Sequence, residues 1–242
     1  MLFRSQTKDF LEGVRSVWYA ASVSSMKPEL SSVFLTHNED EVVFVATDSF
    51  RLAEKKIRVK KLQKFSDILI PVKNIIDIIK ILDGLGDEVL VQISEDQIAL
   101  QLEGVYITSR LVEGNFPDYK QIIPKETKTT IKILKQDLLS GLKTANIFSD
   151  RFNKITFHIE PQNKKLSLKT KNSDVGENTT IINASLSGDD IVMNFNNKYI
   201  IDSLQSIPSD SVKLTFSGDS KPMIIQRSTD QSFLYLAMPM NA

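Results

Sequence analysis

The chain has 242 residues, which is long for one domain and enough for two of roughly 120 residues that each bury a core. Lys plus Arg and Asp plus Glu both number 30, so no net charge draws the protein onto DNA or an anionic membrane, and any nucleic-acid contact needs a local arrangement of charge. The absence of cysteine excludes disulfides, thiolate catalysis and cysteine-ligated zinc.

The first residues, "MLFRSQTKDF", lack the apolar core of a signal peptide, and no apolar run reaches the length of about 18 residues that spans a membrane. These features predict a soluble, cytoplasmic protein. The only imidazoles belong to His37 and His158, and neither has a second ligand at metal spacing. Both are therefore predicted to be surface histidines, and no metal or cofactor is expected.

The first half of the chain alternates between helical and strand patterns. A helix is predicted over about 7–21, where Phe10, Leu11 and Val14 recur at helical spacing and Thr7 is a candidate N-cap. A second helix is predicted over "NIIDIIKIL", residues 74–82. Strands are predicted between and after these helices, in the segments "SVFLTH", "EVVFVAT", "RLAEKKIRV", "DILIP", "DEVLVQI", "QIALQLE" and "VYITSRLV".

The second half repeats this order. "DLLSGLKTA", residues 137–145, matches "DFLEGVRSV", residues 9–17, with Gly141 aligned to Gly13, and "YIIDSLQSI" matches the second helix. Its predicted strands are "KITFHIE", "KLSLKT", "TTIINASLS", "DIVMNF", "DSVKLTF", "PMIIQR" and "SFLYLAM". The sequence thus predicts a tandem α+β duplication with domains 1–120 and 121–242, joined near the two prolines of "FPDYKQIIPK". A duplication by itself predicts only architecture.

Basic residues recur on one face of the predicted helices and are candidates to face a phosphate backbone. These DNA-facing candidates are Lys8, Arg15, Lys73, Lys80, Lys135, Lys143 and Lys198. An ordinary solvated face is the alternative, because Asp77 lies one turn from two of them. The densest basic patch is predicted from Lys56, Arg58 and Lys60, which alternate on one side of a strand.

No catalytic motif is recognisable. The chain has no glycine-rich phosphate loop, no GxSxG turn and no HExxH, and Asp189 and Asp190 lie in a predicted turn, where such residues accept hydrogen bonds from backbone amides. A non-enzymatic protein is therefore predicted.

Two stretches occur in only one half and are better functional candidates than the repeated scaffold. In "VATDSFRLA", residues 45–53, Thr47, Asp48 and Ser49 are predicted to form a compact turn before a strand. In "LYLAMPMNA", Pro239 ends a strand and leaves an apolar, methionine-rich tip that suits a peptide-binding surface. The alternatives are an ordinary hairpin turn and a frayed tail.

"VATDSFRLA", "SRLVEGNFPDYKQIIP" (109–124) and the terminal "MPM", in this order, resemble the second and third domains of the bacterial sliding clamp family, the beta subunit of DNA polymerase III. The resemblance covers essentially the whole chain. It implies tandem DNA-clamp domains, each with two helices on one face and antiparallel sheets on the other. In the family, six such domains close into a ring around duplex DNA, and weak phosphate contacts from the helices permit sliding.

The resemblance further implies a non-catalytic processivity factor of DNA replication, catalogued with the polymerase III holoenzyme, a nucleotidyltransferase complex. The implied partners are duplex DNA, bound topologically and without sequence specificity, replicative and other DNA polymerases, and the clamp loader, with no membrane. The family's pocket for partner peptides maps onto Leu30, Thr47, Arg51, Leu52, Pro117, Ile122, Phe152, Asn196, Tyr199, Pro222, Met238, Pro239 and Met240.

The chain departs from the family pattern at several points. Ser49-Phe50 replaces a common Gly-His, Gln121 replaces a frequent basic residue, and Asn241-Ala242 replaces a common Arg-Leu end. The family's first domain has no counterpart in this sequence, so a fragment that is monomeric in solution is expected. The alternatives are a peptide-binding adaptor that does not encircle DNA and, from another class, an enzyme of unknown type.

Overall fold

The computed structural model describes residues 2–60, 62–228 and 230–241, and residue contacts divide the chain into unit 1, residues 1–117, and unit 2, residues 118–242. Each unit combines α-helices with antiparallel sheets, which confirms the predicted α+β class. Among the helices in these described segments, none is long and apolar enough to cross a membrane.

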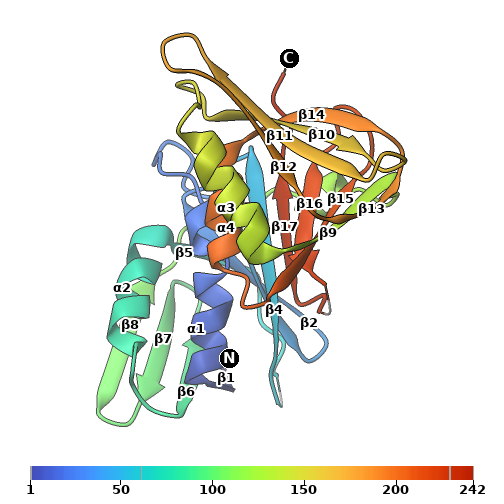
Figure 1. Ribbon diagram of the computed structural model, residues 1–242. Coiled ribbons are helices and arrows are strands. Elements are labelled where there is room, and N and C mark those ends of the chain that lie inside the picture. Colours follow the sequence, from blue (N-terminus) through green and yellow to red (C-terminus); the bar gives the residue numbers. More distant parts are fainter. Residues whose placement is uncertain (1, 61, 229, 242) are drawn as a thin grey trace. The chain divides into compact units, whose positions relative to one another are not determined.

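Unit 1 has two helices and two groups of four antiparallel strands. The helices α1 (Thr7–Arg15) and α2 (Val72–Leu82) lie side by side (Figure 1). One sheet runs in the order β1 (Leu2–Gln6), β6 (Glu88–Ile93), β7 (Gln97–Leu102) and β8 (Val105–Arg110). The other group runs in the order β4 (Arg51–Arg58), β3 (Glu41–Thr47), β2 (Ser32–Asn38) and β5 (Ile68–Pro71).

Helix α1 differs from its predicted form at both ends. Thr7 is the first helical residue and not the N-cap, because the chain passes directly from β1 into the helix and the Thr7 amide donates to the Asp87 carbonyl at 3.1 Å. The predicted extension to residue 21 is also wrong. Val17, with φ −124°, leaves the helical region, and the chain continues as a short 3₁₀-helix, Trp18–Ala20.

The core of unit 1 forms where α1 meets the strands β3 and β4. The rings of Phe10 and Phe44 pack edge to face with centroids 5.6 Å apart, and both are fully buried. Gly13 allows this close approach, because a Cβ atom there would lie 2.5 Å from the Phe44 ring. The buried ammonium of Lys55 contacts the Glu12 carboxylate at 2.8 Å, which ties α1 to β4.

Unit 2 repeats the plan. The helices α3 (Lys135–Asn146) and α4 (Asn197–Gln205) also lie side by side (Figure 1). One antiparallel sheet runs in the order β12 (Gly176–Ile182), β11 (Lys165–Asn172), β10 (Lys154–Glu160) and β14 (Ile191–Asn196). The second group runs in the order β13 (Ser185–Gly188), β9 (Thr129–Leu134), β15 (Ser211–Phe216), β16 (Met223–Arg227) and β17 (Phe233–Ala237).

The segment "TTIINASLS" was predicted to be one strand and is two. The chain leaves β12, which pairs with β11, and enters β13, which pairs with β9, so it crosses from one sheet to the other after Ile182. Gly188 closes β13 at φ +106°, where an added Cβ would collide with the backbone of Lys128. Alternation alone does not reveal this break, because more exposed and less exposed residues alternate both in β12 and at the start of β13.

The two histidines are half-buried rather than on the surface as predicted. His37 lies on β2, with its ring centroid 4.8 Å from that of Phe65. His158 lies on β10. Burial lowers the pKa of His158, the nearby Lys169 and Lys165 lower it further, and Glu160 opposes them.

Candidate functional sites

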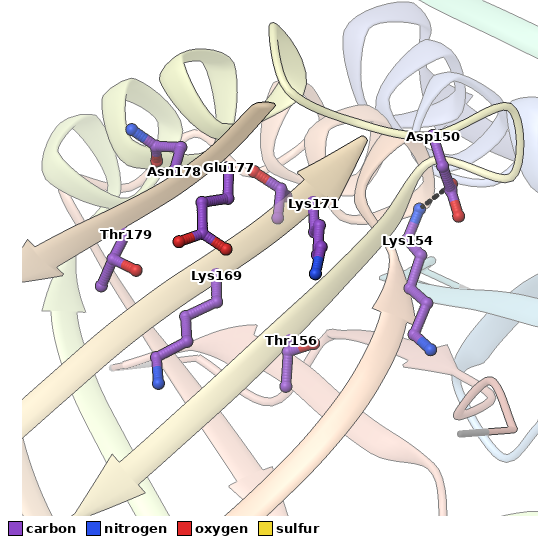
Figure 2. A pocket seen from close by; sticks show the side chains of 9 residues that line it. Asp150, Lys154, Thr156, Lys169, Lys171, Glu177, Asn178 and Thr179 are labelled. Atoms are coloured by element: carbon purple, nitrogen blue, oxygen red, sulfur yellow. Dashed lines mark hydrogen bonds between the residues drawn. The ribbon is translucent and has the colours of Figure 1, made fainter. Parts of the chain in front are cut away.

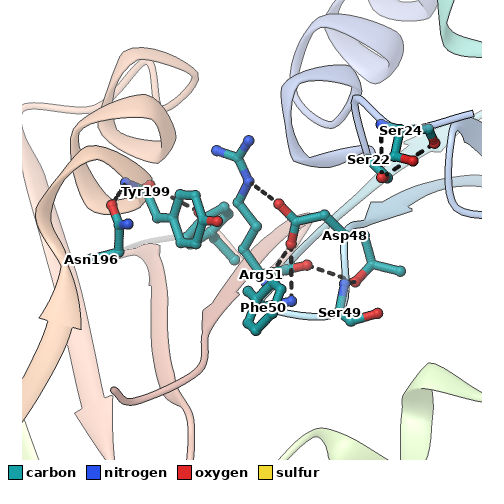
Figure 3. A network of polar contacts seen from close by, with 10 residues as sticks. Ser22, Ser24, Asp48, Ser49, Phe50, Arg51, Asn196 and Tyr199 are labelled. Atoms are coloured by element: carbon teal, nitrogen blue, oxygen red, sulfur yellow. Dashed lines mark hydrogen bonds and ion pairs between the residues drawn. The ribbon is translucent and has the colours of Figure 1, made fainter. Parts of the chain in front are cut away.

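The turn between β3 and β4 has the predicted form, with Thr47 at the end of one strand and Arg51 at the start of the next. Asp48 organises it, because one carboxylate oxygen accepts from the amides of Phe50 at 2.9 Å and Arg51 at 3.0 Å (Figure 3). The Thr47 hydroxyl donates to the Arg51 carbonyl at 2.6 Å and accepts from the Ser49 amide at 3.1 Å. Ser49 has φ +77°, in the left-handed region that glycine prefers.

The same carboxylate also fixes the guanidinium of Arg51. Arg51 Nε donates to the other Asp48 oxygen at 3.0 Å, and only 10% of the arginine side chain is exposed. A charge-assisted pair that is this buried holds the planar donor group in one orientation. Phe50 projects from the tip of the turn and is 63% exposed. The turn therefore offers a fixed cationic donor and an exposed aromatic ring within two residues.

The other candidates of unit 1 differ in their exposure. Leu30 and Leu52 are buried, so they support the surface from below rather than forming its outer layer. The Leu30 carbonyl accepts from the Ser22 amide at 2.8 Å, which anchors the loop before β2. Pro117 is exposed at the end of unit 1.

In unit 2, the structure brings three candidates together at the start of α4. The Asn196 side chain caps the helix by accepting from the Tyr199 amide at 3.3 Å (Figure 3), and its amide nitrogen donates to the Phe152 carbonyl at 3.2 Å. The Tyr235 hydroxyl donates to the Tyr199 carbonyl at 2.8 Å. Phe152 exposes 55% of its surface, and the Arg151 guanidinium lies 4.7 Å from its ring centroid.

The C-terminal candidates are ordered rather than frayed. The Met240 amide donates to the Asn194 carbonyl at 2.8 Å, which ties the segment after Pro239 to β14. Met238, Pro239 and Met240 remain half-exposed. Two further candidates lie elsewhere in unit 2, with Pro222 buried and Ile122 exposed at the end of the 3₁₀-helix Tyr119–Ile122.

The basic helix residues fall into two groups. Three are engaged, since Arg15 pairs with Asp83 at 2.8 Å, Lys80 pairs with Asp77 at 3.3 Å, and the Lys135 ammonium donates to the Ile207 carbonyl at 2.7 Å. The remaining candidates are exposed and have no ion pair in the described part of the chain. They are Lys8, Lys73, Lys143 and Lys198.

The predicted basic patch of β4 is balanced by acidic neighbours. Lys56 lies 3.4 Å from the carboxylate of Glu54, and Arg58 lies 3.8 Å from that of Glu41 on the paired strand. Carboxylates therefore offset the charge of two of the three basic residues, and the partner of Arg58 lies on the neighbouring strand, where local spacing does not reveal it. Within residues 2–60, 62–228 and 230–241, no group of three or more His, Asp or Glu side chains is placed to hold a metal ion.

Family models match the two halves of the chain separately. The model described as "DNA polymerase III beta subunit, central domain" matches residues 5–118, and the model for the C-terminal domain of the same subunit matches residues 120–241. The curated proteins named "Beta sliding clamp" from Halalkalibacterium halodurans and Streptococcus pneumoniae are 29% and 28% identical over 98% and 97% of the chain. The chain spans 64% and 63% of the length of these relatives.

Solved structures agree with these matches. A DNA polymerase sliding clamp from Bacillus subtilis is 25% identical, with a TM-score of 0.96 over 100% of this chain and 64% of that one. A DNA polymerase III beta subunit from Thermotoga maritima is 26% identical, with a TM-score of 0.94 over 100% of this chain and 66% of that one. Since the family models together cover nearly every residue, the chain belongs to the DNA polymerase III beta subunit family.

Proposed function

We propose that the chain acts as part of a DNA sliding clamp, a non-catalytic processivity factor that tethers the replicative polymerase to duplex DNA in the cytoplasm. The observation that carries this proposal is the match to the central and C-terminal domains in family order. The relatives of that architecture are named sliding clamps. Under this proposal the protein needs no active site, because it acts by retaining a polymerase near its template.

Contact with DNA is proposed for the exposed helix lysines Lys8, Lys73, Lys143 and Lys198. An ammonium without a carboxylate partner attracts phosphate oxygens and reads no base, so such contacts hold the duplex weakly and allow movement along it. Arg15, Lys80 and Lys135 are less suited, because intramolecular partners already engage them.

Binding of partner peptides is proposed for the candidates described on each unit. In unit 1, Arg51 supplies a fixed donor beside the exposed ring of Phe50. In unit 2, Tyr199, Phe152 and the segment Met238–Met240 supply apolar surface with few polar groups, which suits short peptides with large apolar side chains. The proposed partners are replicative and other polymerases and the clamp loader, which would compete for these residues.

The proposal is tested by titrating a fluorescent peptide from a polymerase's clamp-binding tail into the protein. We expect saturable binding, with affinity reduced about tenfold or more in Arg51→Ala, because hydrogen bonds to charged groups contribute about 1.5–3 kcal/mol. Met240→Ala is expected to weaken binding as well. Arg58→Ala, which removes an exposed arginine on the same strand, is the matched control and should bind like the original protein.

Absence of binding would contradict the peptide-binding part of the proposal. Peptide binding without retention on circular DNA, measured in the complete clamp with its loader, would instead favour the adaptor that does not encircle DNA. The oligomeric state is a separate test. We expect the 242-residue chain by itself to be monomeric, and a mass of three chains would contradict this and point to a ring of six domains.

A further inference from the structure

The sheet of unit 2 carries a polar groove of about 510 Å³ on the face opposite α3 (Figure 2). The two faces are distinguished by neighbouring residues on β11, since the Thr170 hydroxyl donates to the Ala145 carbonyl of α3 and Lys169 points the other way. The residues that line the groove come from β10, β11, β12 and, with Asp150, the turn before β10. They include Lys154, Thr156, Lys169, Lys171, Glu177 and Thr179.

Two lysines of the groove have no acidic neighbour across the strand ladder. Lys169 lies in register between Thr156 and Thr179, and Lys154 lies opposite Asn196. Sheets commonly place a carboxylate opposite a lysine because the pair is stabilising. Here neither ammonium has an ion pair in the described residues, so neither lysine stabilises the sheet through a cross-strand ion pair.

The acidic residues of the groove are placed elsewhere. Glu177 lies in register with Lys171. Lys171 follows Thr170, the β11 residue that faces α3. One carboxylate oxygen of Asp150 accepts from the amides of Phe152 at 2.9 Å and Lys154 at 3.1 Å, which holds it against the backbone. The groove therefore has a local excess of positive charge in a chain with no net charge.

Apolar side chains adjoin this charged area. His158 lies in register with Val192 on one side and Ser167 on the other, and Ser167 lies in register with Ile181. Val192 and Ile181 expose 60% and 65% of their surfaces. Burial and then Lys169 lower the pKa of His158, while Glu160 opposes them, so the neutral imidazole is favoured beside these apolar side chains.

We propose that this groove binds an extended acidic segment of a protein partner, with carboxylates on Lys154 and Lys169. The two lysines are diagonal neighbours on paired strands, which places their backbones about 7–8 Å apart. An extended peptide carries side chains of one face about 6.7 Å apart, so carboxylates two residues apart match that separation. The partner's intervening or flanking apolar residues would contact Val192 and Ile181.

Nucleic acid fits the groove less well. Glu177 stands within it and would repel a continuous phosphate backbone, whereas a peptide places its charges at separate points. Among the described residues, the groove lining includes no aromatic ring, and base stacking contributes much of the affinity for single strands. This inference does not depend on the residues proposed for DNA or for clamp-binding peptides.

The test measures fluorescence anisotropy at low salt with a labelled short peptide of alternating Glu and Thr. We expect saturable binding that is lost when Gln replaces Glu in the peptide. Binding should weaken about fivefold in K154Q/K169Q, because each exposed ion pair contributes little. The control K132Q/K213Q removes two charges from the other sheet of the same unit and should bind like the original protein.

A charge exchange separates contact from misfolding. K154E/K169E is expected to reject the Glu–Thr peptide and to bind its Lys–Thr counterpart, which an unfolded variant would not do. The proposal is overturned if the Glu–Thr peptide fails to bind or binds all variants equally. It is also overturned if oligo-dT binds more tightly than the Glu–Thr peptide and K154Q/K169Q weakens the binding of oligo-dT, since the groove would then be a nucleic-acid site.

Discussion

The first helices of the two units share a glycine but meet different neighbours. A Cβ atom at Gly13 would lie 2.5–2.9 Å from three carbons of the Phe44 ring, which is fully buried. A Cβ atom at Gly141 would lie 2.5 Å from the terminal methyl of Ile182 and 3.3 Å or more from its other neighbours. Unit 1 thus packs its first helix on a rigid ring, and unit 2 packs its first helix on the movable end of an aliphatic side chain.

The largest expected effect comes from substituting these glycines. Gly13→Ala should lower the free energy of unfolding of unit 1 by about 2 kcal/mol, because overpacking exceeds the gain in helix propensity. Gly141→Ala should change that of unit 2 by less than about 1 kcal/mol, since Ile182 can rotate away. Urea unfolding measures both, with fluorescence of Trp18, the single tryptophan, reporting on unit 1. Equal losses would show that the two interfaces are equally rigid.

The polar contacts that join the first helix of each unit to its sheet also differ. Unit 1 uses the ion pair between Glu12 and the buried Lys55, and unit 2 uses a neutral hydrogen bond from Thr170 to the Ala145 carbonyl. Glu12→Gln should destabilise unit 1 by about 1 kcal/mol, because a buried ammonium loses a carboxylate that is itself 40% exposed. Thr170→Val should cost unit 2 about half as much. A larger loss for Thr170→Val in urea unfolding would reverse the comparison.

The turns provide a change that should stabilise. In unit 1, Ser49 occupies φ +77°, whereas the corresponding connection in unit 2 leads into Gly176 at φ +118°. Ser49→Gly removes the cost of a side chain in the left-handed region and adds unfolded-state entropy, so a net gain of about 0.5 kcal/mol is expected. The midpoint of thermal unfolding followed by Trp18 fluorescence measures it. Ser24→Gly, at a position where φ is not positive, is the control and should give no gain.

The smallest expected effect is a pH dependence confined to unit 2. The folded-state pKa of His158 lies below its usual value of about 6.5, so the unfolded chain takes up the proton first as the pH falls. The stability contributed by His158 is therefore present above about pH 6.5 and decreases as the pH falls below it. The urea midpoint between about pH 5 and 7 measures this. His158→Gln should flatten the dependence, and an unchanged slope would assign it to other groups.

Much of the fold was predictable because the two halves of the sequence show the same order of helix and strand patterns. The repeated helix patterns placed α2, α3 and α4 within about two residues of their observed limits. The failures arose where spatial neighbours decide the outcome. Thr7 does not cap α1, because the backbone already continues from β1 and the carbonyl of Asp87 meets its amide.

The candidate sites were predictable to different degrees. The turn at residues 47–51 follows from local chemistry, since Asp48 hydrogen-bonds to amides two and three residues later. The hydrogen bond from the Asn196 side chain to the Phe152 carbonyl joins residues far apart in sequence, and no local sequence pattern predicts it. The same is true of the pairs that neutralise Arg15 and Arg58, which only the folded chain brings together.

The contacts of Asp48 have a thermodynamic consequence for any ligand of Arg51. The carboxylate holds the guanidinium and two backbone amides before a ligand arrives, so the arginine has little rotamer freedom left to lose. Ordering a long side chain at an interface ordinarily costs about 0.5–1.5 kcal/mol. Calorimetry of Asp48→Asn should therefore show the loss mainly as a less favourable binding entropy, which would identify Asp48 as the residue that preorganises this surface.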